Sequence, residues 1–86
     1  MGNMVGMELR VNKMVAEQLA INVSRVIPGA AFIEDLGADS LDKVELVMNL
    51  EQAFDIKVKD EDGEKVSTIQ DVYDLIRSHS ATTLAA

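Results

Sequence analysis

The chain has 86 residues, of which 8 are basic and 15 are acidic, so its formal net charge is −7. This balance disfavours a nucleic-acid-binding protein and a protein that docks on anionic membranes, because both need a basic surface. It favours partners with positive patches instead. The chain has no cysteine, no signal-peptide pattern and no apolar run of the roughly 18 residues that a spanning helix needs. We therefore expect one small cytoplasmic domain, monomeric and not inserted in a membrane, without disulfides or thiol chemistry.

A first helix is predicted from about residue 4 to residue 19, where apolar residues recur at helical spacing on one side. Residues 1–6 are expected to form a flexible leader and residues 7–79 the folded domain. Residues 80–86 are small and polar and are expected to form a frayed tail.

A long loop is predicted from residue 22 to residue 39, punctuated by Pro28 and Gly29. Ordered loops of this length are usually functional or packed by their own apolar side chains. The side chains expected to anchor this loop on the core are Val26, Ile27, Phe32, Ile33 and Leu36.

A second helix is predicted from Ser40 to about Phe54, with Asp39 or Ser40 as its cap. The acidic residues 60–65 allow at most one short helical turn. A last helix is expected to begin near residues 67–70, where Ser and Gln stand at the spacing of a capping box. The sequence thus predicts an all-α fold, a small bundle of three main helices and one short helix with a long first loop.

The second helix carries two separate apolar stripes. One is an ordinary core stripe, and it consists of Leu46, Val47, Leu50, Ala53 and Phe54. The other stripe, made of Leu41, Val44 and Met48, points away from the first and is flanked by acidic residues. Either neighbouring elements bury both stripes, or the second stripe is a docking surface inside an acidic rim. Residues Glu34 to Glu64 include 11 acidic and 3 basic residues, which favours docking of basic partners.

Residues for catalysis or metal binding are scarce. The only histidine, His79, stands near the end of the chain and is expected to be a solvated surface residue. The acidic segment 60–63 does not fit an EF-hand loop, because Val58 and Ile69 stand where ligands would be needed. No base can be paired with a serine from the sequence. We therefore predict no catalytic residue, no metal site and no enzyme activity.

Ser40 stands directly before the apolar run of the second helix and has two interpretations. It is either an N-cap, which is a frequent use of serine at this position, or the bearer of a phosphate ester. A phosphate there would be favoured by the free N–H groups and the dipole of the helix N-terminus.

The residues around Ser40 carry a family resemblance. Residues 36–42, Leu-Gly-Ala-Asp-Ser-Leu-Asp, and residues 44–48, Val-Glu-Leu-Val-Met, closely resemble the acyl carrier proteins of bacterial-type (type II) fatty acid synthesis. The likeness extends from about Val11 to Ile76 and includes Phe32-Ile33-Glu34-Asp35.

This resemblance implies that Ser40 carries 4′-phosphopantetheine, added from coenzyme A by a phosphopantetheinyl transferase, which would make the chain a phosphoprotein. The thiol of that group would hold the growing acyl chain as a thioester and present it to fatty acid synthesis enzymes with basic docking patches. The residues implied to meet these partners are Asp39, Leu41, Asp42, Val44, Glu45, Met48, Glu51 and Asp60. The residues implied to match the family's interior are Val11, Val15, Phe54 and Ile76.

Lys43 departs from the family's pattern. It places a positive charge in the first turn of the second helix, on the core side, so its stem would have to extend outwards. Two further interpretations stay open. One is a carrier of the same fold for polyketide, peptide or lipid A-type pathways, and the other is a non-carrier acidic adaptor in which Ser40 is only a cap.

Overall fold

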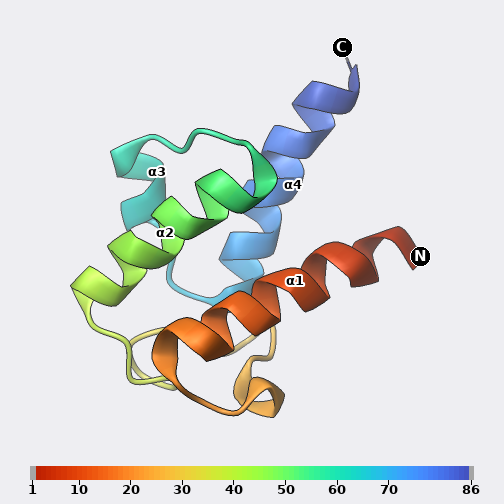
Figure 1. Cartoon of the computed structure of the whole chain (residues 1–86). Coiled ribbons are helices and arrows are strands. Elements are labelled where there is room, and N and C mark those ends of the chain that lie inside the picture. Colours follow the sequence, from red (N-terminus) through yellow and green to blue (C-terminus); the bar gives the residue numbers. More distant parts are fainter. Residues whose placement is uncertain (1, 86) are drawn as a thin grey trace.

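We describe a computed structural model, which gives the backbone of residues 2–85 and the side chains of residues 6–79. Three long helices and one short helix form the bundle, and a single 3-10 turn, η1, follows the first helix (Figure 1). Their bounds are α1 Gly2–Leu19, η1 Val23–Arg25, α2 Ser40–Phe54, α3 Asp60–Glu64 and α4 Ile69–Ala85. The predicted all-α class and the number of helices are confirmed, whereas η1 was not predicted.

Helix α1 packs against both α2 and α4, and the short α3 packs beside α2. In Figure 1, α1 and α2 run in roughly opposite directions, and the long loop between them passes beneath the bundle before it reaches α2. None of the described helices is both long enough and apolar enough to cross a membrane.

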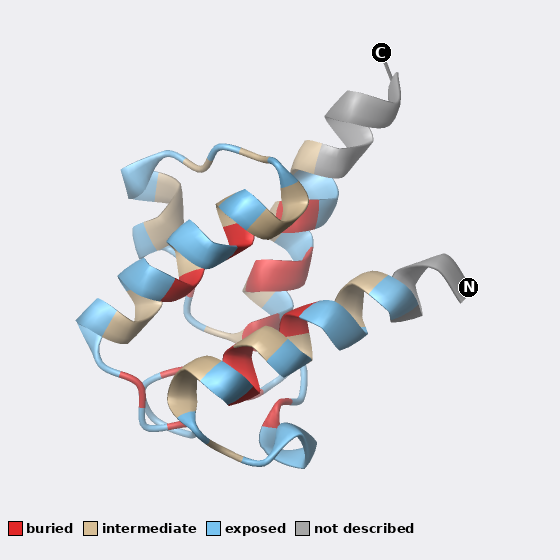
Figure 2. Ribbon diagram, in the orientation of Figure 1, coloured by how far each residue is buried: buried red, intermediate tan, exposed pale blue. Residues whose placement is uncertain are grey.

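The core is mainly aliphatic, with Phe32 and Tyr73 as its largest buried side chains, and lies where α1, α2, α4 and the long loop meet (Figure 2). Among the described side chains it contains no charged or polar residue. Val11, Val15 and Ile76 are buried, as the resemblance implied. Phe54 is only half-buried, because it lies at the edge of the core, where the guanidinium of Arg10 covers its ring 4.6 Å from the centroid. That contact is a cation–π interaction.

The long loop is anchored at three of its five expected positions. Val26, Phe32 and Leu36 are buried, but Ile27 and Ile33 are 56% and 55% exposed, so the prediction that they pack on the core is wrong. Around Ile33, the loop runs beside the segment that leads into α4, through an isolated bridge between Ala31 and Thr68. There the N–H of Phe32 donates to the carbonyl of Ser67 at 2.9 Å, which directs Phe32 inwards and its neighbour outwards.

Helix α4 begins one residue later than the predicted capping box. Thr68 Oγ1 accepts from the N–H of Asp71 at 3.3 Å, and Asp71 Oδ2 accepts from the N–H groups of Thr68 and Ser67 at 3.0 and 2.9 Å. The capping pair is therefore Thr68 with Asp71 and not Ser67 with Gln70. The bond from the Ser67 N–H is the main cause that lowers the pKa of Asp71. Burial opposes this, while Thr68 and the charge of Lys43 add to it.

The first and last helices, α1 and α4, continue over residues that were expected to lie outside the domain. The backbone of α1 extends back to Gly2 and that of α4 forward to Ala85. The side chains of residues 1–5 and 80–86 lie outside the described part, so the leader and tail stay predictions. His79 was expected to be solvated, but it is half-buried, with Nδ1 lying 2.9 Å from the carbonyl oxygen of Leu75.

Candidate functional site

The start of α2 is fixed by Asp39 and not by Ser40. Asp39 Oδ1 accepts from the N–H of Asp42 at 2.8 Å, and Asp42 Oδ2 accepts from the N–H of Asp39 at 3.1 Å. This reciprocal pair is a capping box, which satisfies two N–H groups at the helix end. Ser40 is therefore the first residue of the helix proper. It is exposed, and its hydroxyl makes no hydrogen bond with any described residue, so interpreting Ser40 as the cap is wrong.

Gly37 gives the chain its turn into this helix. Its φ of +75° lies in the left-handed region, which glycine adopts without steric cost. Directly after it, Ala38 is buried and donates its N–H to the carbonyl of Phe32 at 2.8 Å. The loop is thereby held against the core immediately before Asp39, and Ser40 emerges on the surface.

The two apolar stripes of α2 have different environments. Leu46 and Leu50 are buried, with 3% and 2% of their surface exposed. We call the second stripe the outer face of α2. It consists of Leu41, Val44 and Met48, which are 62%, 55% and 53% exposed. The alternative in which neighbouring elements bury both stripes is therefore wrong.

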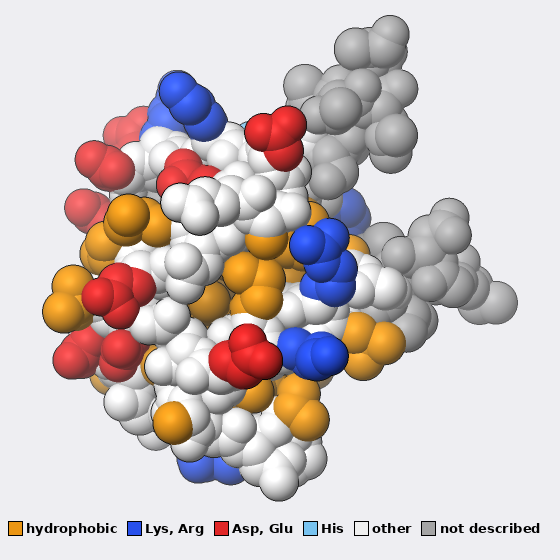
Figure 3. Space-filling model, in the orientation of Figure 1, with side chains coloured by type: hydrophobic (Ala, Val, Ile, Leu, Met, Phe, Trp, Pro, Cys, Tyr) orange, Lys and Arg blue, Asp and Glu red, His pale blue; other side chains and the backbone are white. Residues whose placement is uncertain are grey.

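Acidic side chains surround this outer face, and two of them, Glu45 and Glu51, bond to other parts of the chain. Glu45 Oε1 accepts from Gln18 Nε2 at 2.9 Å, and Gln18 Oε1 in turn accepts from Asn49 Nδ2 at 3.1 Å. Glu51 Oε2 accepts from the N–H of Val58 at 2.7 Å, which ties the end of α2 to the connection before α3. Figure 3 shows acidic and apolar side chains side by side on the face over α2 and α3.

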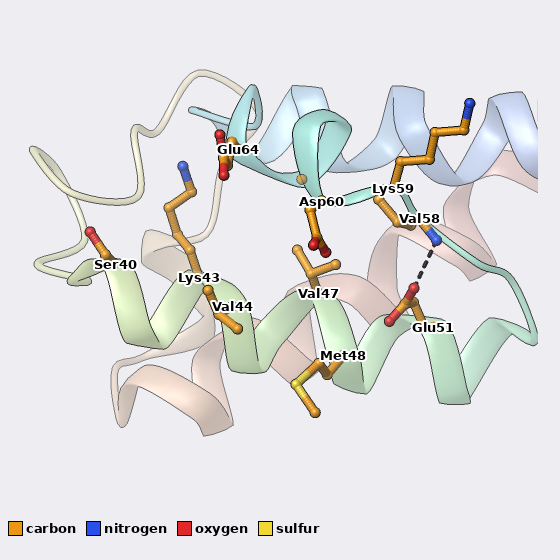
Figure 4. Close-up of a pocket in the computed structure, with 11 residues that line it drawn as sticks. Ser40, Lys43, Val44, Val47, Met48, Glu51, Val58, Lys59, Asp60 and Glu64 are labelled. Atoms are coloured by element: carbon orange, nitrogen blue, oxygen red, sulfur yellow. Dashed lines mark hydrogen bonds between the residues drawn. The ribbon is translucent and has the colours of Figure 1, made fainter.

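A groove of about 680 Å³ separates α2 from α3 (Figure 4). Ser40 lies at one end of this groove, and Glu51 and Lys59 lie towards the other end. Lys43 and Val47 rise from α2 between these ends, and the residues contributed by α3 are Asp60, Gly63 and Glu64. Asp60, the one expected partner residue outside α2 and its cap, thus faces that helix across the groove.

The helical wheel did not identify this groove. It assigned Val47 to the core stripe, whereas the structure leaves Val47 half-buried beneath Gly63, whose added Cβ would lie 3.8 Å from its methyl groups. The wheel placed Lys43 on the core side of α2, whereas in the structure Lys43 is half-buried and lines the wall of the groove. In the sequence, Gly63 within the acidic segment is the only signal that the third helix is short and leaves space beside α2.

Comparison with known proteins assigns this arrangement to a family. Residues 10–76 match the phosphopantetheine attachment site family, over most of the chain. Among solved structures, the chain is similar to one described as "a putative acyl carrier protein" from Mycobacterium tuberculosis. The two share 29% sequence identity with a TM-score of 0.76, and the match covers 88% of this chain and 96% of the other. The chain therefore belongs to the phosphopantetheine attachment family, whose members are carriers with phosphopantetheine as their prosthetic group and are not themselves catalysts.

Proposed function

We propose that the protein is the acyl carrier of type II fatty acid synthesis, with 4′-phosphopantetheine attached to Ser40. The observation that carries this proposal is an exposed hydroxyl at the first position of α2, unused by the capping box, directly beside an exposed apolar face. A helix cap needs no such face, and the adaptor alternative gives Ser40 no role once Asp39 performs the capping.

The residues present fit the prosthetic group. A phosphodiester on Ser40 would lie at a helix N-terminus, where unpaired backbone N–H groups and the helix dipole favour negative charge. Because Asp39 and Asp42 satisfy each other's N–H groups, attachment at Ser40 would disturb no existing side-chain bond. When bound, the group supplies a terminal thiol that can carry an acyl chain, which this cysteine-free chain has no residue to supply.

The outer face of α2 would serve as the docking surface for the phosphopantetheinyl transferase and for cytoplasmic fatty acid synthesis enzymes with basic patches. Its three apolar side chains would fill hollows on the partner, and Met48 is a flexible side chain that adapts to different shapes. The acidic rim would attract basic partners over long range and raise the association rate. In this account Glu45 is held ready for docking by Gln18, while Glu51 also fixes the chain that leads to α3.

The attachment site is tested by incubating the apo protein with coenzyme A and a transferase of broad specificity, followed by intact mass measurement. We expect the parent and the control variant Ser24→Ala, which removes another exposed hydroxyl, to gain the mass of one pantetheine phosphate. Ser40→Ala should gain nothing. Modification of Ser40→Ala to the same extent as the parent, or no modification of the parent, would contradict the assignment.

The pathway is tested with the loaded protein. We expect a condensing enzyme of fatty acid synthesis to accept it with a kcat/KM at least tenfold above that of a polyketide condensing enzyme. A reversed preference would support the carrier function but contradict its assignment to fatty acid synthesis.

A further inference from the structure

Lys43 is a cation without a direct partner in the fold, although its charge helps to lower the pKa of Asp71. It stands in the first turn of α2, half-buried, and lines the groove between α2 and α3 as well as a smaller hollow beside Ile33 and Ser67. Among the described side chains the one ion pair joins Arg77 to Asp74 at 3.8 Å, so the ammonium of Lys43 has no carboxylate within salt-bridge distance. It also makes no hydrogen bond with a described residue.

The position of Lys43 relative to Ser40 is specific. The two residues are three apart in a helix, so they are neighbours on one face with Cβ atoms roughly 5–6 Å apart. Figure 4 shows both side chains rising from the same side of α2, towards α3. The other cation of the groove, Lys59, lies near the opposite end.

The charges around Ser40 make this cation matter. Asp39 and Asp42 stand within two residues of Ser40, and Glu64 faces the same end of the groove from α3. A phosphodiester on Ser40 adds one more negative charge to this acidic surface. Lys43 is the only basic residue between Glu34 and Asp55, and it lies one helical turn from the attachment point.

We propose, on the basis of the function proposed above, that Lys43 binds the phosphodiester of the prosthetic group on Ser40 and holds the start of that arm over the groove between α2 and α3. Lys43 is thus a positioning residue that offsets the repulsion from the surrounding carboxylates. It directs the arm towards the groove and away from the outer face of α2, which stays accessible to partners.

A comparison of three proteins, each with and without the arm, tests this proposal without any partner enzyme. The urea unfolding equilibrium is measured for the apo and arm-bearing forms of the parent, Lys43→Met and Lys59→Met, with attachment verified by mass. In Lys43→Met, attachment of the arm should favour the folded state less than it does in the parent. The difference should be about a two- to fivefold change in the unfolding equilibrium constant, the range of an exposed ion pair. The matched control Lys59→Met should leave the effect of attachment unchanged, and 0.5 M salt should remove most of the difference.

Two further variants and one spectroscopic signal keep the test independent of the folding of Lys43→Met. Lys43→Arg should restore the parent's behaviour, and Lys43→Gln should act like Lys43→Met. The ³¹P resonance of the arm should shift between the parent and Lys43→Gln but not between the parent and Lys59→Met. An arm that adds to all variants with the same unfolding effect and the same resonance would overturn the role of Lys43 while leaving attachment at Ser40 intact. A parent that accepts no arm would overturn both.

Discussion

Helices α2 and α4 have similar lengths, 15 and 17 residues, but they use their apolar side chains differently. The described apolar stripe of α4 turns inwards, and its buried members are Ile69, Val72, Tyr73 and Ile76, each at most 2% exposed. Helix α2 buries only Leu46 and Leu50 and leaves its outer face more than half exposed. Helix α4 therefore contributes its apolar stripe to the core, whereas α2 leaves an apolar face that no described element covers.

The largest expected effect lies on α4. Ile76→Ala should lower the free energy of unfolding by about 2–5 kcal/mol, because it removes buried methyl and methylene groups and leaves a cavity. Urea denaturation, monitored by circular dichroism, measures this loss of unfolding free energy. The matched change on α2, Val44→Ala, should cost less than about 0.5 kcal/mol, as expected for an exposed side chain. Equal losses for the two variants would remove the distinction between the helices.

A charge reversal on the acidic rim should have the next largest effect. Glu45→Lys should weaken binding to a basic fatty acid synthesis enzyme about tenfold at low salt, or about 1.4 kcal/mol, mainly by slowing association. Surface plasmon resonance at several salt concentrations measures this, and the loss should fade as salt increases. Glu17→Lys, the same change at an exposed position of α1, is the control. A loss of equal size in Glu17→Lys would show that only net charge matters.

The turn that presents Ser40 should tolerate a side chain poorly. Gly37→Ala should lower the free energy of unfolding by about 1 kcal/mol, because an alanine at φ +75° is strained even though nothing lies within 4 Å of its added Cβ. Gly29→Ala is a matched control in the same loop. It also has open space but no left-handed φ, so it should be neutral or slightly stabilising. Thermal unfolding of both variants distinguishes strain from a general sensitivity of the loop.

The smallest effect concerns the start of α4 and depends on pH. The pKa of Asp71 is lowered in the folded protein, chiefly by the N–H of Ser67, so its charged form stabilises the fold above the ordinary aspartate pKa of about 4. That contribution is lost as the pH falls through the lower pKa of the folded state. Asp71→Asn should therefore be less stable than the parent at pH 7, and the difference should shrink below about pH 4. A difference independent of pH would show that the charge of Asp71 is not what stabilises this cap.

Sequence periodicity predicted the elements well and the contacts between them less well. The bounds of α2, Ser40 to Phe54, follow from local signals, namely a capping pair at one end and an apolar run that stops at the other. The turn η1 and the bridge between Ala31 and Thr68 were not predicted, since the bridge depends on a loop pairing with a distant part of the chain.

At the site, too, the sequence predicted features of a single helix but not the contacts between helices. The wheel separated the two stripes of α2 correctly except at Val47, because their spacing is a property of one helix. It could not show that Gln18, 27 residues away from Glu45, would bond to its carboxylate, or that Arg10 would cover Phe54. It also could not show that α3 would stand far enough from α2 to leave a groove beside Lys43. These features arise from the packing of separate helices.

We propose that the outer face of α2 is used for binding and not for folding. The double variant Val44→Ala/Met48→Ala tests it most directly when the free energy of unfolding and the Kd for a basic condensing enzyme are measured on the same arm-bearing sample, with Leu50→Ala as the inward-facing counterpart. We predict a loss of stability below about 1 kcal/mol together with at least tenfold weaker binding for the double variant. Leu50→Ala should lose about 2–5 kcal/mol of stability while its folded fraction binds normally. A double variant that binds like the parent but unfolds several kcal/mol more easily would contradict the claim.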